Sequence, residues 1–179
     1  LLLFRFEKEY FDKEKITNSF VGHPLLDKKI DENIQIDQFL DKKKIISIFP
    51  GSRTSEINHH MPILINFIKK MNIKDPSYNF IFHGTDKNKE LISSYISKEH
   101  IQNLEIINDD KIKTAVLKKS IFAVVKSGTV SLEVCKMNVP SIIIYKMNFV
   151  NFYLAKFLLN IKFVNMINII NNREVIPEL

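Results

Sequence analysis

The chain has 179 residues, enough to bury a hydrophobic core, and its 45% hydrophobic and 26% charged residues are ordinary for a globular protein. No run of about 18 apolar residues occurs, so no membrane-spanning helix is predicted, and the single cysteine, Cys135, excludes an internal disulfide. The net charge of +6 comes mostly from lysines spread over every segment, a compositional bias that does not favour nucleic acid as a partner.

The N-terminal segment, residues 1–20, is expected to form an incoming strand and a connector. Because the chain begins at Leu1 and not at a methionine, we expect a fragment or a processed piece of a protein. The segment "LLLF" is too short for a signal-peptide core. Residues 18–22 are predicted to form a short strand that ends at Gly22, and residues 30–42 a weak helix. Residues 21–179 are expected to form one Rossmann-like domain that is truncated at its C-terminus.

From residue 44 onward, apolar strand-like runs alternate with helical patterns. The predicted strands are 44–49, 78–83, 104–107, 120–125 and 140–145. The predicted helices are 55–72, 86–98 with Asp86 as its N-cap, 109–118, 129–137 and a long aromatic helix at 149–160. This alternation indicates an α/β fold with a Rossmann-like parallel sheet and helices on both faces, which binds ligands beyond the carboxyl ends of its strands.

Two turns at that edge of the sheet carry residues suited to a phosphate group. Gly51, Ser52 and Arg53 follow the first of these strands and precede a helix, whose N-terminus favours an anion, and an arginine can pair two phosphate oxygens at once. The alternative interpretation is an ordinary strand–helix turn with a surface arginine. Arginine is informative here because the chain has only Arg5, Arg53 and Arg173 among its many lysines.

The second turn is Ser127-Gly128-Thr129, where Gly128 permits a positive φ. Glu133 lies one helical turn further on, and its carboxylate could bind the two hydroxyls of a ribose. The alternative is N-capping by Ser127 or Thr129, with Glu133 in solvent. Both turns at one sheet edge favour a nucleoside-diphosphate site, while P-loop, dinucleotide and metal-binding motifs are absent from the sequence, so no cofactor is expected.

The motifs "FVGHPLLD" (20–27), "FPGSRTSEI" (49–57), "KSGTVSLEVCKMNVPSIIIYKMN" (126–148) and "NIINNREVIPEL" (168–179) occur in the order and spacing of one family. Over nearly its whole length the chain resembles the C-terminal half of the lipid-A-disaccharide synthases. That resemblance implies a GT-B glycosyltransferase, or hexosyltransferase, of which this chain is the UDP-sugar-binding half. The implied enzyme transfers 2,3-diacylglucosamine from its UDP donor to 2,3-diacylglucosamine 1-phosphate and releases UDP, in lipid A biosynthesis.

The resemblance also implies roles for individual residues. Arg53 would stabilise the diphosphate, the Ser127–Thr129 turn would contact the phosphates and Glu133 the ribose, while Asn168 and Arg173 would border the donor. The family usually has alanine where this chain has Lys126. The catalytic residues are unknown, and because no acidic residue here carries a general-base motif, the base is expected in the N-terminal half.

The implied setting is the cytoplasm, at the inner face of the inner membrane, where the full-length protein could form a homodimer. Residues 149–162 could rest on anionic lipid as an interfacial helix, or could pack in the core. His59 and His60 are expected to face solvent, and His83 to end a strand at the ligand edge. Alternative functions are another UDP-sugar GT-B enzyme, of the peptidoglycan N-acetylglucosaminyltransferase or UDP-N-acetylglucosamine 2-epimerase type, or a basic membrane-surface adaptor without activity.

Overall fold

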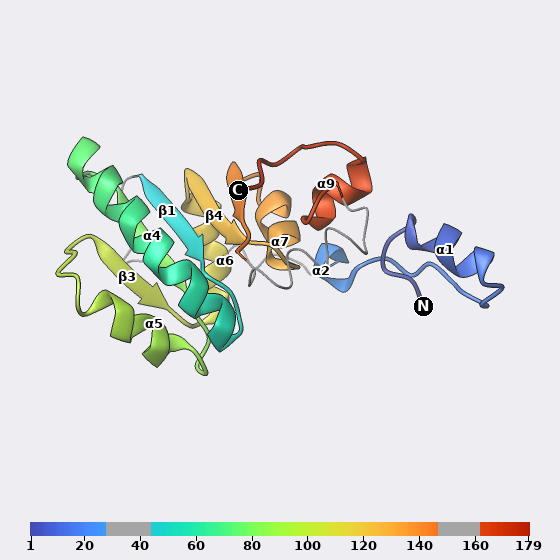
Figure 1. The fold of residues 1–179 in the computed structure, drawn as a ribbon, viewed down its shortest axis with the longest axis horizontal. Helices are drawn as coiled ribbons and strands as arrows, with labels where there is room; N and C mark the ends of the chain where they lie inside the picture. The colour runs from blue at the N-terminus through green and yellow to red at the C-terminus, as the bar shows by residue number, and fades with distance from the viewer. Residues whose placement is uncertain (28–43, 147–161) are drawn as a thin grey trace.

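The computed structural model describes residues 1–27, 44–146 and 162–179 of the chain (Figure 1). The helices predicted at 30–42 and 149–160, and with the latter the interfacial helix, lie outside the described residues. Within the described part of the chain, no helix is both long and apolar enough to cross a bilayer.

Five parallel strands form one sheet in the order β3-β2-β1-β4-β5. They are β1 (Ile45–Phe49), β2 (Asn79–His83), β3 (Leu104–Ile107), β4 (Phe122–Lys126) and β5 (Ser141–Ile144). The predicted parallel sheet is therefore confirmed. The chain first adds strands on one side of β1 and then crosses to the other side, so the strand order reverses between β1 and β4.

The helices are α1 (Glu7–Lys13), α2 (Pro24–Asp27), α4 (Thr54–Lys74), α5 (Lys89–Ile96), α6 (Asp110–Lys119), α7 (Val130–Lys136) and α9 (Met166–Asn171). Those predicted between residues 55 and 137 are confirmed in position. One end differs, because α5 begins at Lys89 with Asn88 at its N-cap position instead of Asp86. The Asp86 side chain is engaged elsewhere and accepts a hydrogen bond from Asn108.

Helices cover both faces of the sheet, and the alternation of side chains along each strand explains why. Ile46, Ile48, Phe80 and Phe82 point to one face and pack against α4 and α5. Residues on the opposite face, such as Ile81 and Val125, pack against α6, α7 and α9. Figure 1 shows α4 and α5 lying together across the front of the sheet. The carboxyl ends of the strands remain free to form a site.

The C-terminal residues add to the sheet along the outer edge of β5. The Ile143 amide donates to the Pro177 carbonyl (2.8 Å), and the Leu179 amide donates to the Ile143 carbonyl (2.9 Å). The Tyr145 amide donates in turn to the Leu179 carbonyl (3.0 Å). Residues 177–179 therefore satisfy backbone groups of β5 that an edge strand would leave open.

The N-terminal segment differs from its prediction, since residues 7–13 form α1 instead of an incoming strand. Glu7 favours this helix because its carboxylate accepts the Leu3 and Phe4 amides (2.9 and 2.8 Å), which fixes its first turn. The strand predicted at 18–22 is also wrong, because Phe20 forms only an isolated bridge with Leu2.

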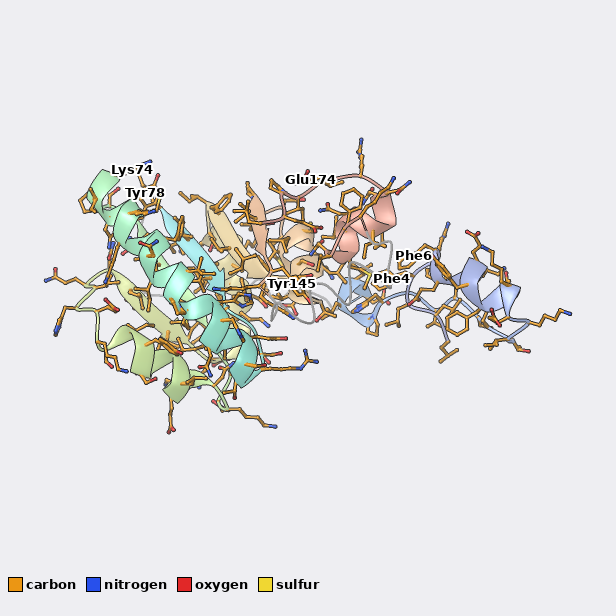
Figure 2. All side chains as sticks on the ribbon, viewed as in Figure 1. Phe4, Phe6, Lys74, Tyr78, Tyr145 and Glu174 are labelled. Atoms are coloured by element: carbon orange, nitrogen blue, oxygen red, sulfur yellow. The ribbon has the colours of Figure 1, made fainter. Side chains whose placement is uncertain are left out.

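Helix α1 buries none of its residues and projects away from the sheet (Figure 1). Phe4 and Phe6 lie where this segment meets the rest of the molecule (Figure 2). Their rings stack with centroids 5.9 Å apart, and Phe4 also contacts the ring of His23 at 5.4 Å. An aromatic contact thus anchors the base of the segment, while its far end lies in solvent.

Candidate functional site

A pocket of about 210 Å³ opens at the carboxyl edge of the sheet, beside the reversal of strand order between β1 and β4. Ligands of open α/β sheets bind at such a switch point. The turns after β1, β2 and β4 supply most of the lining, and α6 and α7 supply the rest. The lining residues are Phe49, Gly51, Ser52, His83, Gly84, Thr85, Asp110, Lys113, Lys126, Ser127, Gly128, Thr129, Val130 and Glu133.

The turn after β1 requires glycine at position 51. Gly51 adopts a φ of +127°, and a Cβ there would lie 2.8 Å from the Cβ of Glu56. Any side chain would therefore be strained by its backbone conformation and would also collide with Glu56. Gly51 lets the chain turn from β1 into α4 with Glu56 folded back over the turn.

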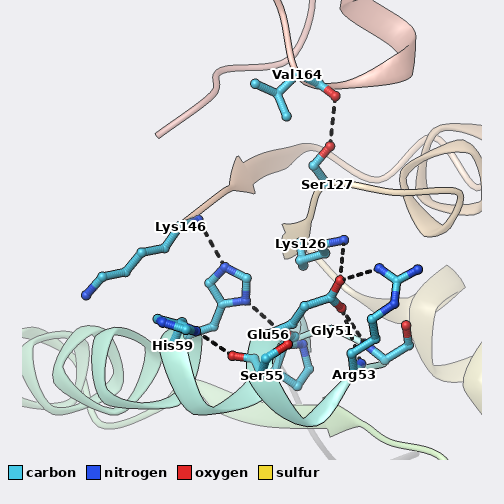
Figure 3. Close-up of polar contacts among 12 residues, drawn as sticks. Gly51, Arg53, Ser55, Glu56, His59, Lys126, Ser127, Lys146 and Val164 are labelled. Carbon is cyan, nitrogen blue, oxygen red and sulfur yellow. Dashed lines mark hydrogen bonds and ion pairs between the residues drawn. The ribbon is translucent and has the colours of Figure 1, made fainter. Parts of the chain in front are cut away.

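The Glu56 carboxylate contacts donors from the turn after β1 and from the end of β4 (Figure 3). Its carboxylate accepts the Ser52 and Arg53 amides at 3.1 and 3.3 Å, as a carboxylate does at a helix N-terminus. The Arg53 guanidinium and the Lys126 ammonium each lie 2.9 Å from its Oε1 atom. Partial burial raises the pKa of Glu56, but Lys126 and the two amides outweigh it and lower the pKa to about 2. Glu56 is therefore ionised at neutral pH.

The turn after β4 is open toward the pocket. A Cβ on Gly128 would meet no atom within 4 Å, and Gly128 does not adopt the positive φ that the sequence allowed. Neither expected cap is formed: Ser127 Oγ donates to the Val164 carbonyl (3.0 Å), and Thr129 makes no side-chain cap to α7. Within the described part of the chain, the amides of Gly128 and Thr129 have no acceptor, so a ligand oxygen could fill that role.

Glu133 is held by a neighbouring cation instead of standing in solvent. The Lys113 ammonium lies 3.1 Å from Glu133 Oε2 and 3.2 Å from Asp110 Oδ1. Burial lowers the pKa of Lys113, but the two carboxylates outweigh it and raise the pKa above its ordinary value, so the ammonium stays charged. The ion pair with Lys113 fixes the position of the Glu133 carboxylate at the pocket wall.

His83 contributes a neutral ring to the pocket, stacked on Phe49 with centroids 4.1 Å apart. Its pKa falls to about 3 because the ring is buried and the Lys113 charge opposes protonation. His83 Nε2 lies 2.7 Å from Ser47 Oγ, which lies 2.7 Å from Ser120 Oγ. Ser120 donates its proton to the Val116 carbonyl (3.0 Å).

That chain of hydrogen bonds fixes the position of the ring proton. Because the Ser120 proton is used on Val116, Ser47 must donate to Ser120, and His83 Nε2 must then donate to Ser47. A neutral ring with its proton on Nε2 has a bare lone pair on Nδ1. This Nδ1 atom is buried and accepts no hydrogen bond within the described part of the chain.

The structure brings most of the predicted site residues together: Gly51, Ser52, Ser127, Gly128, Thr129 and Glu133 all line the pocket. Arg53, Asn168 and Arg173 are not among the lining residues. The Arg53 side chain is 77% exposed and points to Glu56, and Arg173 is exposed just beyond α9.

Asn168 is fully buried and organises the chain around α9. Its Oδ1 accepts the Val175 and Ile176 amides (2.7 and 3.0 Å), and its Nδ2 donates to the Ile176 carbonyl and to Glu178 Oε1 (both 2.7 Å). These partners lie at residues 175–178, just before and within the segment that pairs with β5. In this structure Asn168 supports the fold of residues 165–179.

Sequence analysis missed Lys113, Lys126 and Glu56 as parts of the site. Glu56 had a visible signal, since an acidic residue three positions after a helix N-cap often folds back on that cap. Lys126 was noted only as a departure from the family pattern. In the described residues, no group of three or more His, Cys, Asp or Glu side chains is arranged to hold a metal ion.

Comparison of the sequence with known families matches Lipid-A-disaccharide synthetase over residues 1–179. Lipid-A-disaccharide synthase 1 of Legionella pneumophila (strain Paris) is 33% identical and lipid-A-disaccharide synthase of Coxiella burnetii (strain Dugway 5J108-111) is 34% identical. Each alignment covers 99% of this chain and 47% of the relative. The chain therefore spans about half the length of the curated relatives it matches.

Solved structures share the fold at low sequence identity. The Staphylococcus aureus MnaA-UDP co-structure has a TM-score of 0.54 and 15% identity, over 80% of this chain and 39% of that one. The UDP-GlcNAc 2-epimerase of Neisseria meningitidis, bound to UDP-GlcNAc, has a TM-score of 0.51 and 16% identity, over 93% and 42%. These likenesses, together with the observed sheet, agree with the Rossmann-like half of a GT-B fold.

Proposed function

The chain belongs to the lipid-A-disaccharide synthetase family, and from that premise we propose that it is the donor-binding half of a glycosyltransferase that uses a UDP-sugar. The whole enzyme would transfer 2,3-diacylglucosamine from UDP to 2,3-diacylglucosamine 1-phosphate. Residues 1–20 would connect this half to the other, and residues 21–179 would form the nucleotide domain.

One observation carries the proposal: the pocket at the β1–β4 switch point joins charged side chains to two turns, and the turn after β4 has two amides without an acceptor in the described chain. The Gly128 and Thr129 amides would donate to phosphate oxygens. Glu133, which Lys113 holds in place, would accept hydrogen bonds from the two hydroxyls of the ribose. Arg53 would approach the diphosphate only if its side chain left Glu56, so its role stays a prediction.

The chemistry of the leaving group accounts for the charges at this site. As the glycosidic bond to UDP breaks, negative charge develops on the β-phosphate, and fixed positive groups lower the barrier by stabilising it. The attacking 6-hydroxyl of the acceptor needs a general base, which we place in the other half of the enzyme. The acylated substrates would bring the enzyme to the inner face of the inner membrane as a peripheral protein, and a homodimer of the full-length protein stays a prediction.

Calorimetry with UDP, ATP and GTP tests the proposed ligand. We expect UDP to bind the chain measurably and more tightly than either purine nucleotide. Circular dichroism and a cooperative thermal transition would show that the sample is folded. Equal affinity for the three nucleotides, or no UDP binding by a folded sample, would overturn the assignment.

Sequence separates this reading from the other UDP-sugar enzymes. Two UDP-N-acetylglucosamine 2-epimerase structures share 14% and 16% identity with the chain, whereas the curated synthases share 30–34% over nearly all of it. Likeness at the lower level shows the fold alone. We therefore propose the synthase reaction over epimerisation.

A further inference from the structure

Lys126 ends β4 at the wall of the pocket, and its side chain is only 18% exposed. Its ammonium lies 2.9 Å from Glu56 Oε1, the atom that Arg53 contacts as well (Figure 3). Of these two cations, Lys126 lines the pocket and Arg53 does not. The positive charge available to a ligand inside the pocket, on the side of the two turns, therefore comes from Lys126.

Lys126 can bind a second anion without leaving Glu56. An ammonium group carries three hydrogen-bond donors, and the described structure gives this one a single acceptor, Glu56 Oε1. Lys126 lines the same pocket as Gly128 and Thr129, whose amides have no acceptor in the described chain. Partial burial weakens solvent screening, which strengthens contact with a charged ligand.

The other charged cluster of the pocket, around Lys113, carries a different net charge. There the Lys113 ammonium lies between Asp110 and Glu133, so two carboxylates surround one cation. A phosphate would meet net negative charge on that side, whereas hydroxyl groups would find acceptors. The charges thus assign phosphate to the Lys126 side and the diol to the Glu133 side.

We propose that Lys126 binds the phosphates of the nucleoside-diphosphate donor directly. The inference rests on the proposed function, since it requires such a nucleotide in the pocket. None of the roles that the resemblance implies falls on Lys126, so the contact is inferred from this structure alone. Glu56 is the partner that neutralises Lys126 in this structure.

Calorimetry of wild type and Lys126→Met with UDP, UMP and uridine tests the proposal. We expect Lys126→Met to weaken UDP binding by about 10- to 100-fold, the range for a lost charge-assisted hydrogen bond. UMP should lose less, uridine binding should not change, and Lys126→Arg should restore most of the affinity for UDP. Lys119→Met, at an exposed position in the last turn of α6, is the matched control and should bind UDP as wild type does.

Two further variants separate a direct contact from a change in folding. Glu56→Gln keeps an acceptor for the Ser52 and Arg53 amides and removes a negative charge, so UDP should bind at least as tightly as in wild type. The double variant Glu56→Gln/Lys126→Met removes both charges of the partly buried pair and leaves only the exposed Arg53 without its carboxylate partner, so it should fold normally and should still bind UDP weakly.

The outcomes point in different directions. If wild type binds UDP and Lys126→Met binds it with the same affinity, this inference alone is overturned. An equal loss of UDP and uridine, or a loss in Glu56→Gln as large as in Lys126→Met, would show that the pair only shapes the turn and would also overturn it. No UDP binding by a folded wild-type chain would overturn the proposed function together with this inference.

Discussion

At the scale of single residues, the pocket is controlled by which charges are already neutralised inside the protein. Lys126 and Lys113 each lie against a glutamate, so neither presents a bare charge to the pocket. His83 adds a ring that burial keeps neutral. The pocket is therefore lined by ion-paired lysines and by a neutral histidine ring.

The protonation of His83 can be observed directly by nitrogen NMR of the imidazole. We expect the neutral form with the proton on Nε2 from pH 8 to pH 5, because the folded-state pKa is about 3. An Nδ1–H signal, or protonation near pH 6.5, would contradict the hydrogen-bond chain through Ser47 and Ser120. A Ser47→Ala variant removes the acceptor of Nε2 and serves as the control for the tautomer.

The low pKa of His83 determines how it changes the free energy of unfolding with pH. The unfolded ring takes up a proton below about pH 6.5, whereas the folded ring stays neutral until about pH 3. His83 therefore contributes stability above pH 6.5 that is lost progressively as the pH falls toward 3. Replacing His83 with Phe should flatten this part of the pH dependence of the free energy of unfolding.

At the scale of elements, the strands and the central helices follow from the pattern of apolar residues. Ile45, Ile48, Phe80 and Phe82 lie in near-continuous apolar runs, and such runs predict strands that helices cover on both sides. The ends and caps were harder to predict: α1 begins where Glu7 accepts two backbone amides, and the predicted cap of α5, Asp86, bonds to Asn108 instead.

Helix α4 also shows a prediction that failed. His60 was expected to face solvent, but it lies on the buried face with Ile57, Met61 and Leu64. Its Nδ1–H donates to the Pro50 carbonyl (2.8 Å), and its Nε2 accepts the Lys146 amide (3.2 Å). Helical periodicity placed His60 beside the apolar positions, and only the assumption that histidine is polar suggested otherwise.

Replacing His60 tests how α4 is joined to the sheet edge. His60→Ala should lower the free energy of unfolding by about 2–4 kcal/mol, because it leaves two backbone groups without partners and opens a cavity. His59→Ala is the matched control on the neighbouring, exposed position and should change stability by less than about 0.5 kcal/mol. Urea unfolding followed by circular dichroism measures both, and equal effects would refute the role of His60.

At the scale of the whole molecule, the turns of the site were predictable and its side-chain pairing was not. Gly51 and Ser127 follow strands whose ends must share an edge, so their proximity followed from the topology. The pairing of Lys126 with Glu56 depends on the lateral placement of segments far apart in sequence. Asn168 shows the converse, because its polar side chain is used entirely inside the fold.

The chain alone should not synthesise the disaccharide. It spans about half of its curated relatives and carries no side chain to which we assign the general base. Incubation with the UDP donor and the acceptor, followed by mass spectrometry, should detect no product. UDP binding by the same preparation is the control for a folded pocket, and product from a pure sample would show that the base lies in this half.

The strand order has a consequence for how the chain folds. Ile46 pairs with Phe80 on one side and with Phe122, much farther along the chain, on the other. The β1–β2–β3 half can therefore assemble from nearer contacts, while the β1–β4 pairing closes a longer loop at a greater entropic cost. Because the pocket spans that last-formed boundary, an intermediate with only the first half assembled could not bind the nucleotide. Recovery of binding during refolding would then report the formation of the β1–β4 pairing.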